Sequence, residues 1–363
     1  MKRERDWLFI LPSDHLGGAE QLIHNLVNSL NKNYNCKVYI LTKKKHGAWS
    51  GLEPTCDIKY IPFKSYYLGF IAFIPYLIIY SLMNKTKYIF SSQTLINGLV
   101  GFTKKIGFLS NSKIIVREST SVFHAISGNK LKLYKTAYKL GYSNTDLIIC
   151  QTEFMKNQLI KAIPWIQKKN KLVVLNNPIN LENISKKNLV NKNLLKEEFI
   201  ITAGRLIKIK GYDILINAFK KVQDKYPNLK LFILGEGPER DSLTELKNKL
   251  NLENKVLLKG FTENVYPFFK NSSLCVVSSR LEGFPNVLLQ MMSQNTKVVS
   301  TLCAGGIDKL NGVYTCPTHD SEALANSMLK CLEDNTEKNR KKFDDILSQR
   351  TIKKFIELII KEL

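Results

Sequence analysis

Short apolar runs alternate along this chain with longer segments in which apolar residues recur at helical spacing. In the first half the runs occupy residues 7–11, 37–42, 88–90, 114–116, 146–150 and 172–175. In the second half they occupy residues 199–203, 229–234, 256–258, 274–277 and 297–300. Short apolar runs separated by helical patterns predict parallel strands joined by crossover helices. Because the alternation restarts near residue 198, we expect an α/β protein with two Rossmann-like, doubly wound domains.

The chain has 363 residues, which exceeds the usual size of one domain. Residues 181–197 are rich in Asn and Lys and predict a linker. We therefore expect an N-terminal domain at residues 1–180, a C-terminal domain at residues 198–340 and a basic helical tail at residues 341–363.

Residues 65–84 form an uncharged, aromatic stretch that is long enough to span a bilayer. Gly69 and Pro75 interrupt it, and a strand-like run follows at once, as in a crossover unit. We favour a helix of the first domain, partly buried and partly resting in a membrane interface, with flanking lysines near anionic headgroups. An ordinary core helix and a true membrane span are the alternatives.

The formal net charge is +23. Residues 1–180 hold 25 Lys and Arg against 9 Asp and Glu, a net of +16, so the excess lies in the first half. Such a field attracts nucleic acid, anionic lipid or anionic small molecules. The aromatic residues cluster in an apolar stretch, not among the Lys and Arg, and no nucleic-acid-binding motif is present. We therefore expect an anionic membrane surface, and no nucleic acid, as a partner.

The seven cysteines are scattered without a CxxC pair, and several lie in apolar runs. They predict buried free thiols in a reducing compartment, not a disulfide framework or a zinc site. The first apolar run covers only residues 7–11, which is too short for the core of a signal peptide. These features favour a cytoplasmic protein.

The loop between the run at 274–277 and the helix expected from Asn286 carries the main candidate site. A strand, a polar loop and a helix N-terminus form the place where ligands bind in open α/β sheets. Glu282 is the acid of this loop. Backbone N–H groups from Phe284 to Val287 would face an anion at the helix start. The helix is expected to place Val287, Leu288, Met291 and Met292 on an apolar face.

Two further loops add candidate phosphate-binding groups. Arg205 and Lys210 lie in a strand-to-helix loop that begins at Gly204, and an Arg fork with a Lys point charge suits a diphosphate. Gly17 and Gly18 follow the first strand and precede a helix, which would allow close approach of a phosphate.

Together, the motifs Gly204-Arg205…Lys210-Gly211, Gly235-Glu236-Gly237-Pro238 and Glu282-Gly283-Phe284-Pro285-Asn286 resemble those of the family 4 retaining glycosyltransferases. The resemblance is strongest across residues 199–301 and weaker in the first half. It implies the GT-B architecture, in which two Rossmann-like domains face a central cleft. The family typically needs no metal and no other cofactor, because cationic side chains replace the metal.

The resemblance also implies roles for individual residues. Arg205 and Lys210 would bind the diphosphate of a nucleotide-sugar donor, and Glu282 would contact hydroxyls of the donor sugar. The remaining predicted donor contacts would come from Gly17, Gly18, Gly204, Gly260, Phe261, Gly283, Phe284, Pro285, Asn286 and Val287.

Two positions depart from the family pattern. Where the family places a second glutamate on the nucleotide ribose, this chain has Gln290, which can still hydrogen-bond hydroxyls but carries no charge. The family often has a histidine after the strand that corresponds to residues 114–116. Here His124, Glu118 or Ser119 could serve that place, and His124 is carried forward as the catalytic candidate.

The expected function is transfer of a hexose or N-acetylhexosamine, from a donor with uridine as its base, to a lipid-linked or other saccharide acceptor. The enzyme would act in cell-surface polysaccharide synthesis, such as O-antigen or capsule, on the inner face of the cytoplasmic membrane. A nucleotide-sugar 2-epimerase of the same fold and a basic nucleic-acid-binding protein are the alternatives.

Overall fold

The structure, a computed structural model, describes residues 3–44, 47–182, 184 and 197–363. It divides into two compact units. Unit 1 comprises residues 1–178 and 352–363, and unit 2 comprises residues 179–351. Most of the linker expected at residues 181–197 lies outside the described residues. The expected C-terminal tail differs from this division, because its first helix belongs to unit 2 and its second to unit 1.

Unit 1 contains a seven-stranded parallel sheet of order β3-β2-β1-β4-β5-β6-β7. Its strands are β1 (Arg3–Leu11), β2 (Cys36–Ile40), β3 (Asp57–Tyr60), β4 (Asn84–Ser91), β5 (Lys113–Arg117), β6 (Leu147–Cys150) and β7 (Lys171–Val174). Its helices are α1 (Gly18–Leu30), α2 (Tyr66–Met83), α3 (Thr94–Lys105), α4 (Val122–Ala125), α5 (Gly128–Gly141), η1 (Tyr142–Asn144), α6 (Glu153–Ala162), α7 (Trp165–Lys169) and α15 (Ile352–Lys361).

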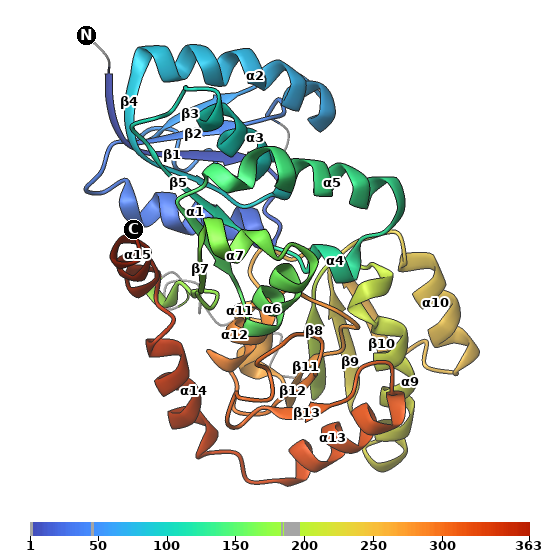
Figure 1. The fold of residues 1–363 in the computed structure, drawn as a ribbon. Coiled ribbons are helices and arrows are strands. Elements are labelled where there is room, and N and C mark those ends of the chain that lie inside the picture. Colours follow the sequence, from blue (N-terminus) through green and yellow to red (C-terminus); the bar gives the residue numbers. More distant parts are fainter. Residues whose placement is uncertain (1–2, 45–46, 183, 185–196) are drawn as a thin grey trace. The chain divides into compact units, whose positions relative to one another are not determined.

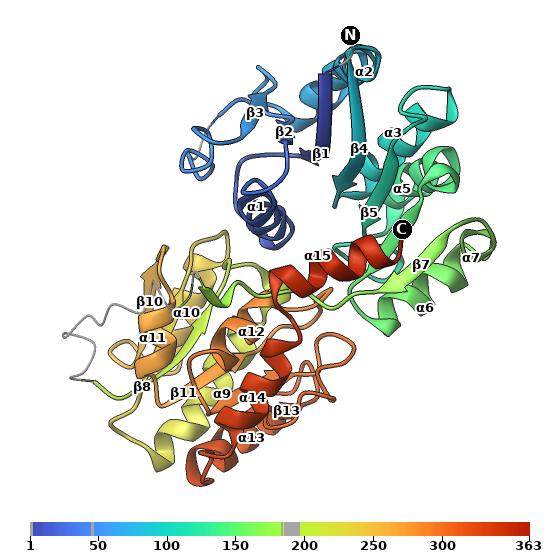
Figure 2. The ribbon, with the colours of Figure 1, turned by 90° about the vertical axis from the view of Figure 1, so that its left-hand side faces the viewer.

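Alternate residues of each strand face the two sides of this sheet, because successive side chains of a strand point in opposite directions. Leu8 and Ile10 of β1 pack under α2, α3 and α5, whereas Trp7 and Phe9 pack against α1 and α15. Figures 1 and 2 both show α2, α3 and α5 on one side of the sheet and α1 on the other.

Unit 2 contains a six-stranded parallel sheet of order β10-β9-β8-β11-β12-β13. Its strands are β8 (Phe199–Ala203), β9 (Lys230–Leu234), β10 (Val256–Gly260), β11 (Leu274–Val277), β12 (Val298–Thr301) and β13 (Tyr314–Cys316). Its helices are η3 (Lys208–Lys210), α9 (Tyr212–Lys225), α10 (Arg240–Lys249), α11 (Tyr266–Asn271), α12 (Asn286–Met292), α13 (Ser321–Glu333) and α14 (Asn339–Ser348).

Each sheet therefore has a point where the strand order reverses, between β1 and β4 in unit 1 and between β8 and β11 in unit 2. In doubly wound sheets, ligands bind beyond the carboxyl ends of the strands at this point. The expected fold class, two Rossmann-like doubly wound domains, is confirmed at the level of each unit. All seven cysteines are buried free thiols, as the sequence indicates.

Candidate active site

The loop that follows β8 holds Arg205 at the switch point of unit 2. Gly204 has φ +154°, and its N–H donates to the carbonyl oxygen of Leu234 at 2.9 Å. A Cβ at Gly204 would lie 2.7 Å from the hydroxyl of Tyr212, so glycine suits this close turn. Arg205 is exposed, and its guanidinium has no hydrogen-bond or ion-pair partner among the residues that the structure describes. It is therefore open to an anionic ligand.

Gly211 joins this loop to the loop that follows β11. It adopts the left-handed conformation at φ +64° and is the residue from which α9 starts. A Cβ there would lie 2.2 Å from the carbonyl oxygen of Ser278, so a larger residue would force the two loops apart. The hydroxyl of Ser278 donates to the carbonyl oxygen of Lys210 at 2.9 Å. These contacts fix the position of the Lys210 backbone.

Lys210 and Glu282 form an ion pair between the two loops. The Lys210 Nζ lies 2.5 Å from Oε1 of Glu282, and the two side chains are only about one fifth exposed. The hydroxyl of Ser279 donates to the same carboxylate oxygen at 2.9 Å. The backbone N–H of Glu282 donates to the carbonyl oxygen of Cys303 at 2.8 Å, which holds the acid loop in place. The sequence singled out both residues but did not predict that they meet.

Arg280 makes a second connection between the same loops. Its guanidinium binds both carboxylate oxygens of Asp213, at 2.8 and 2.5 Å. It also donates to the carbonyl oxygen of Lys208 at 2.6 Å, while its backbone N–H donates to that of Ile209 at 2.7 Å. Sequence reasoning missed this residue. The one sequence feature that could have indicated this ion pair is the position of Asp213 at the start of a helix and of Arg280 beside the loop that carries Glu282.

The loop that carries Glu282 leads into α12, which starts at Asn286. Pro285 precedes its first residue and supplies no N–H group, so the expected row of donors is limited to Phe284, Asn286 and Val287. Phe284 is buried, and the guanidinium carbon of Arg350 lies 5.1 Å from its ring centre. Burial lowers the pKa of Arg350 to about 10. Phe284 therefore anchors the loop in the core of unit 2.

The helix places its apolar residues slightly differently from the expectation. Leu288, Leu289, Met291 and Met292 are buried, whereas Val287 is only partly buried. Further along α12, the side-chain amide of Gln290 lies 3.4 Å from the Tyr266 hydroxyl, and burial raises the pKa of that tyrosine to about 12. Gln290 therefore lies about one turn into α12, and its contact with the nucleotide ribose stays a prediction.

The glycine turns after β9 and β10 lie side by side. The N–H of Gly235 donates to the carbonyl oxygen of Gly260 at 2.8 Å, and both glycines have positive φ. Next to them, the Phe261 ring is 77% exposed. An exposed aromatic ring beside a glycine turn offers a flat surface on which a nucleobase can stack.

In unit 1, Gly17 follows β1 at the N-cap position of α1, and Gly18 is the first residue of that helix. The Glu20 carboxylate lies close to Gly17, because a Cβ added there would meet its Oε2 at 2.7 Å. Burial raises the pKa of Glu20, and the charge of Arg117 opposes that rise. The sequence did not single out this acid.

Arg117 and Glu118 form a buried polar network at the end of β5. Glu118 accepts hydrogen bonds of 2.6 Å from the hydroxyls of Tyr138 and Tyr142, one on each carboxylate oxygen. Arg117 donates to Asn177 at 2.6 Å. Burial lowers the pKa of Arg117 to about 10 and raises that of Glu118. With both oxygens engaged, Glu118 is suited to holding the network together.

The other two candidates near this strand are described less fully. Ser119 is half-buried beside Glu118. The backbone of His124 lies in α4, and its side chain falls outside the described part of the structure. The choice among His124, Glu118 and Ser119 at the acceptor site therefore stays a prediction.

No group of three or more His, Cys, Asp or Glu side chains in metal-binding reach occurs among the described residues. The positive charges of Arg205 and Lys210 lie instead in the loop where a diphosphate is expected. That a donor binds without metal remains a prediction.

Comparisons with known proteins identify the family of the chain. Residues 183–348 match the family model described as Glycosyl transferases group 1. An uncharacterised glycosyltransferase, MJ1059, from Methanocaldococcus jannaschii is 33% identical over 301 residues, covering 70% of this chain and 73% of that protein. A Campylobacter jejuni enzyme is 30% identical over 308 residues, covering 82% and 80%. That enzyme is named N-acetylgalactosamine-N,N'-diacetylbacillosaminyl-diphospho-undecaprenol 4-alpha-N-acetylgalactosaminyltransferase.

A solved structure shares the fold of the whole chain. Anabaena Alr3699/HepE, crystallised with UDP and glucose, superposes with a TM-score of 0.81 over 98% of both chains at 18% identity. This likeness, together with the two parallel sheets, confirms the two Rossmann-like domains of the GT-B fold expected from the sequence.

Proposed function

Because this chain belongs to the glycosyl transferases group 1 family and is a glycosyltransferase, we propose that it is a retaining enzyme of family 4. It moves a hexose or N-acetylhexosamine from a UDP-sugar to a lipid-linked saccharide in cell-surface polysaccharide synthesis. The family membership favours this transfer over the epimerase alternative. The observation that carries the proposal is the Lys210–Glu282 ion pair beside the exposed Arg205, at the switch point of unit 2.

The donor takes over the contacts that the two loops make without it. The diphosphate binds the guanidinium of Arg205 and the ammonium of Lys210, which suit two neighbouring phosphates. Glu282 then accepts hydrogen bonds from sugar hydroxyls through a carboxylate that the fold already holds in place. The backbone N–H groups of Phe284, Asn286 and Val287 donate hydrogen bonds to the sugar or to the distal phosphate.

The rest of the donor extends over neighbouring groups of the same unit. The base stacks near Phe261 at the Gly260 turn, and Gln290 hydrogen-bonds the ribose through its amide. Gly283 and Pro285 shape the loop around the sugar. That Gly17 and Gly18 of unit 1 approach the phosphates stays a prediction.

The chemistry requires little from side chains acting as nucleophiles. The acceptor hydroxyl forms a bond to the anomeric carbon on the face from which the diphosphate leaves, while the bond from that carbon to the phosphate oxygen breaks. The acceptor proton passes to the departing phosphate oxygen. Arg205 and Lys210 stabilise the negative charge that develops on the diphosphate, an electrostatic contribution of several kcal/mol, roughly 3–4 for one fixed donor.

These fixed cations take the place of a metal, so transfer proceeds without a divalent ion. On the acceptor side, His124 or Ser119 contacts the incoming hydroxyl. Glu118 supports them from the buried network, because its carboxylate is already engaged by two tyrosines.

The acceptor is assigned from the Campylobacter relative, whose name specifies a saccharide on diphospho-undecaprenol. A saccharide on such a carrier lies at a membrane surface, so we infer that this enzyme works as a peripheral protein on the inner face of the cytoplasmic membrane.

Transfer assays test the proposal directly. Purified protein is incubated with UDP-hexoses and UDP-N-acetylhexosamines, with a saccharide on undecaprenyl diphosphate, and with EDTA present. We expect transfer with retention of the anomeric configuration, lowered by more than about tenfold in Lys210→Ala. The matched control is Lys249→Ala, at an exposed lysine at the end of α10. Near-wild-type rates in Lys210→Ala, or a strict need for metal, would contradict the proposal.

A further inference from the structure

Helix α2 exposes an apolar face along its whole length. Of the twenty large hydrophobic side chains that remain exposed in the described part of the chain, eight belong to α2. The most exposed are Tyr67, Leu68, Ile71, Ile79, Leu82 and Met83. No charged residue occurs within the helix. A surface helix normally turns polar residues outward, and a continuous apolar patch of this kind marks an interaction site.

The opposite face of α2 is fixed to the sheet of unit 1. Phe73, Leu77 and Tyr80 are buried in the core beneath it. A Cβ at Gly69 would lie 1.7 Å from the carbonyl oxygen of Leu41, so the helix rests directly on the chain that leaves β2. The helix is long and apolar enough to cross a membrane, but it would lose its contacts with the core of unit 1 if it did. The helix therefore lies flat on unit 1, and its outer face is exposed along its whole length.

The layer around α2 is strongly basic. Residues 58–145 contain twelve Lys and Arg and a single acid, Glu118, which is buried. Lys85 and Lys87 follow α2 and are exposed. Helix α5, which lies on the same side of the sheet with α3 between the two, exposes four lysines beside Leu133 and Leu140. Leucines interleaved with lysines are typical of helices that lie in a membrane interface.

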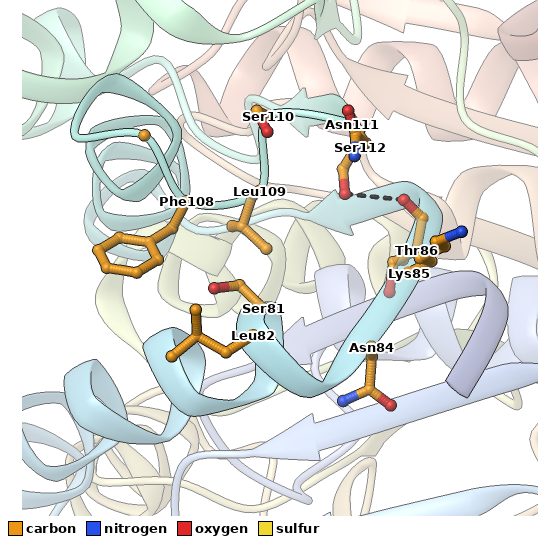
Figure 3. A pocket seen from close by; sticks show the side chains of 11 residues that line it. Ser81, Leu82, Asn84, Lys85, Thr86, Phe108, Leu109, Ser110, Asn111 and Ser112 are labelled. Carbon is orange, nitrogen blue, oxygen red and sulfur yellow. Dashed lines mark hydrogen bonds between the residues drawn. The ribbon is translucent and has the colours of Figure 1, made fainter. Parts of the chain in front are cut away.

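A polar cavity adjoins the end of α2 (Figure 3). It lies between the start of β4 and the loop that precedes β5, and its lining includes Leu82, Lys85, Phe108, Ser110 and Asn111. The hydroxyl of Ser112 is already bonded to the carbonyl oxygen of Thr86 at 2.7 Å. Ser110 and Asn111 are exposed donors at the rim. Hydroxyl, amide and ammonium donors next to an apolar helix end match the headgroup layer of a phospholipid.

We propose that the outer faces of α2 and α5 form the surface by which this enzyme docks, with α2 in the membrane plane, on a bilayer of anionic phospholipid. Charge complementarity selects this occupant. A second copy of the chain would bring two layers of net positive charge together, which is unfavourable. This docking surface rests on the proposed function, because it specifies which face of the enzyme contacts the membrane. Its test does not depend on sugar transfer.

The test is co-sedimentation of the full chain with vesicles. The lipid is phosphatidylcholine alone or mixed with phosphatidylglycerol. The variant Leu68→Gln/Ile71→Gln/Ile79→Gln changes only exposed side chains of α2. The matched control, Leu358→Gln/Ile360→Gln, changes exposed apolar residues of α15, which packs on the other face of the sheet. UDP binding is measured on the same preparations.

We expect wild type and the α15 variant to bind the anionic vesicles, and the α2 variant to bind at least about tenfold more weakly. Raising the salt concentration should weaken wild-type binding, because the lysines contribute through screened charges. Equal binding of the α2 variant and wild type overturns the proposal, as does failure of wild type to bind. A dimer that the α2 variant converts to a monomer also overturns it, because the face then holds a second copy. If only the α2 variant loses vesicle binding, the docking surface is supported, whether or not UDP binds. If UDP does not bind to any of these proteins, the donor assignment fails and the docking surface stands.

Discussion

The ammonium of Lys210 lies 2.5 Å from the carboxylate of Glu282, which joins two loops that follow the neighbouring strands β8 and β11. In the proposed function, the two members of this pair part when the donor binds, one to the diphosphate and one to the sugar. Each therefore keeps the other in position until the donor arrives.

Because of this ion pair, the substitution Glu282→Gln should affect UDP binding and sugar transfer differently. The substitution removes the charge that neutralises Lys210, so UDP alone should bind at least as tightly as in wild type. Sugar transfer should fall by more than about tenfold, because the sugar loses its carboxylate partner. Calorimetric titration with UDP and transfer assays measure the two effects, with Glu245→Gln, at an exposed acid of α10, as the control. Parallel losses of UDP affinity and turnover would argue against the assigned roles.

Arg280 is a positioning residue for the loop that carries Lys210. Removing it in Arg280→Ala frees Asp213 and the carbonyl of Lys208, and misplacement of Lys210 should lower transfer by about tenfold or more. Arg280→Lys should recover only part of the rate, because a lysine cannot make the bidentate contact. The double variant Arg280→Ala/Asp213→Ala should lose little more than either single variant. Additive losses would show that the two residues act independently.

Because Glu118 is buried, the free energy of unfolding should decrease as pH rises. Burial raises its pKa above the value of about 4.3 that an unfolded chain shows. As pH rises from that value to the folded pKa, the unfolded state has released its proton and the folded state still holds it, so stability falls.

Glu118→Gln removes this titration. Its melting temperature should therefore decline less than that of wild type as the pH is raised above about 4.3. Thermal unfolding followed across this range measures the difference, and Glu153→Gln, at an exposed acid of α6, serves as the control. Melting curves of wild type and Glu118→Gln that stay parallel would contradict the assignment.

Gly211→Ala should destabilise unit 2 by about 1–3 kcal/mol or more, because the residue has φ +64° and its new Cβ would meet a carbonyl oxygen. Gly51→Ala is the matched control, since nothing lies within 4 Å of a Cβ there. Denaturant unfolding of the two variants gives the comparison. A Gly211→Ala protein as stable as the control would mean that the two loops are not tightly joined.

The sequence predicted β8 and β11 well because each is a short, fully buried apolar run, whereas β13, which is only partly buried, was not predicted. The bounds of β8 and β11 agree with the expected residues 199–203 and 274–277. Residues 66–83 form the expected helix, which is partly buried, and its contact with a membrane interface stays a prediction.

Helix α3 was not predicted, because Gly98 and Gly101 lower its helical signal. In the structure these glycines allow close packing against α5, since a Cβ at Gly98 would lie 2.8 Å from Ala137. Such a contact between distant segments leaves no local pattern. The Lys210–Glu282 ion pair and the hydrogen bonds of Arg280 likewise leave no local pattern, because they join residues that are 67 to 72 positions apart in the sequence.

The central claim is that the loops after β8 and β11 hold the diphosphate of a UDP-sugar without metal. Thermal unfolding with UDP, GDP or ADP, in EDTA, tests it in wild type, Arg205→Ala and the Lys249→Ala control. A nucleotide at about a hundred times its dissociation constant adds roughly 2.7 kcal/mol to the stability. We predict that UDP raises the melting temperature of wild type and the control but not of Arg205→Ala. Stabilisation of Arg205→Ala equal to that of wild type, or no stabilisation of wild type by UDP, would contradict the account.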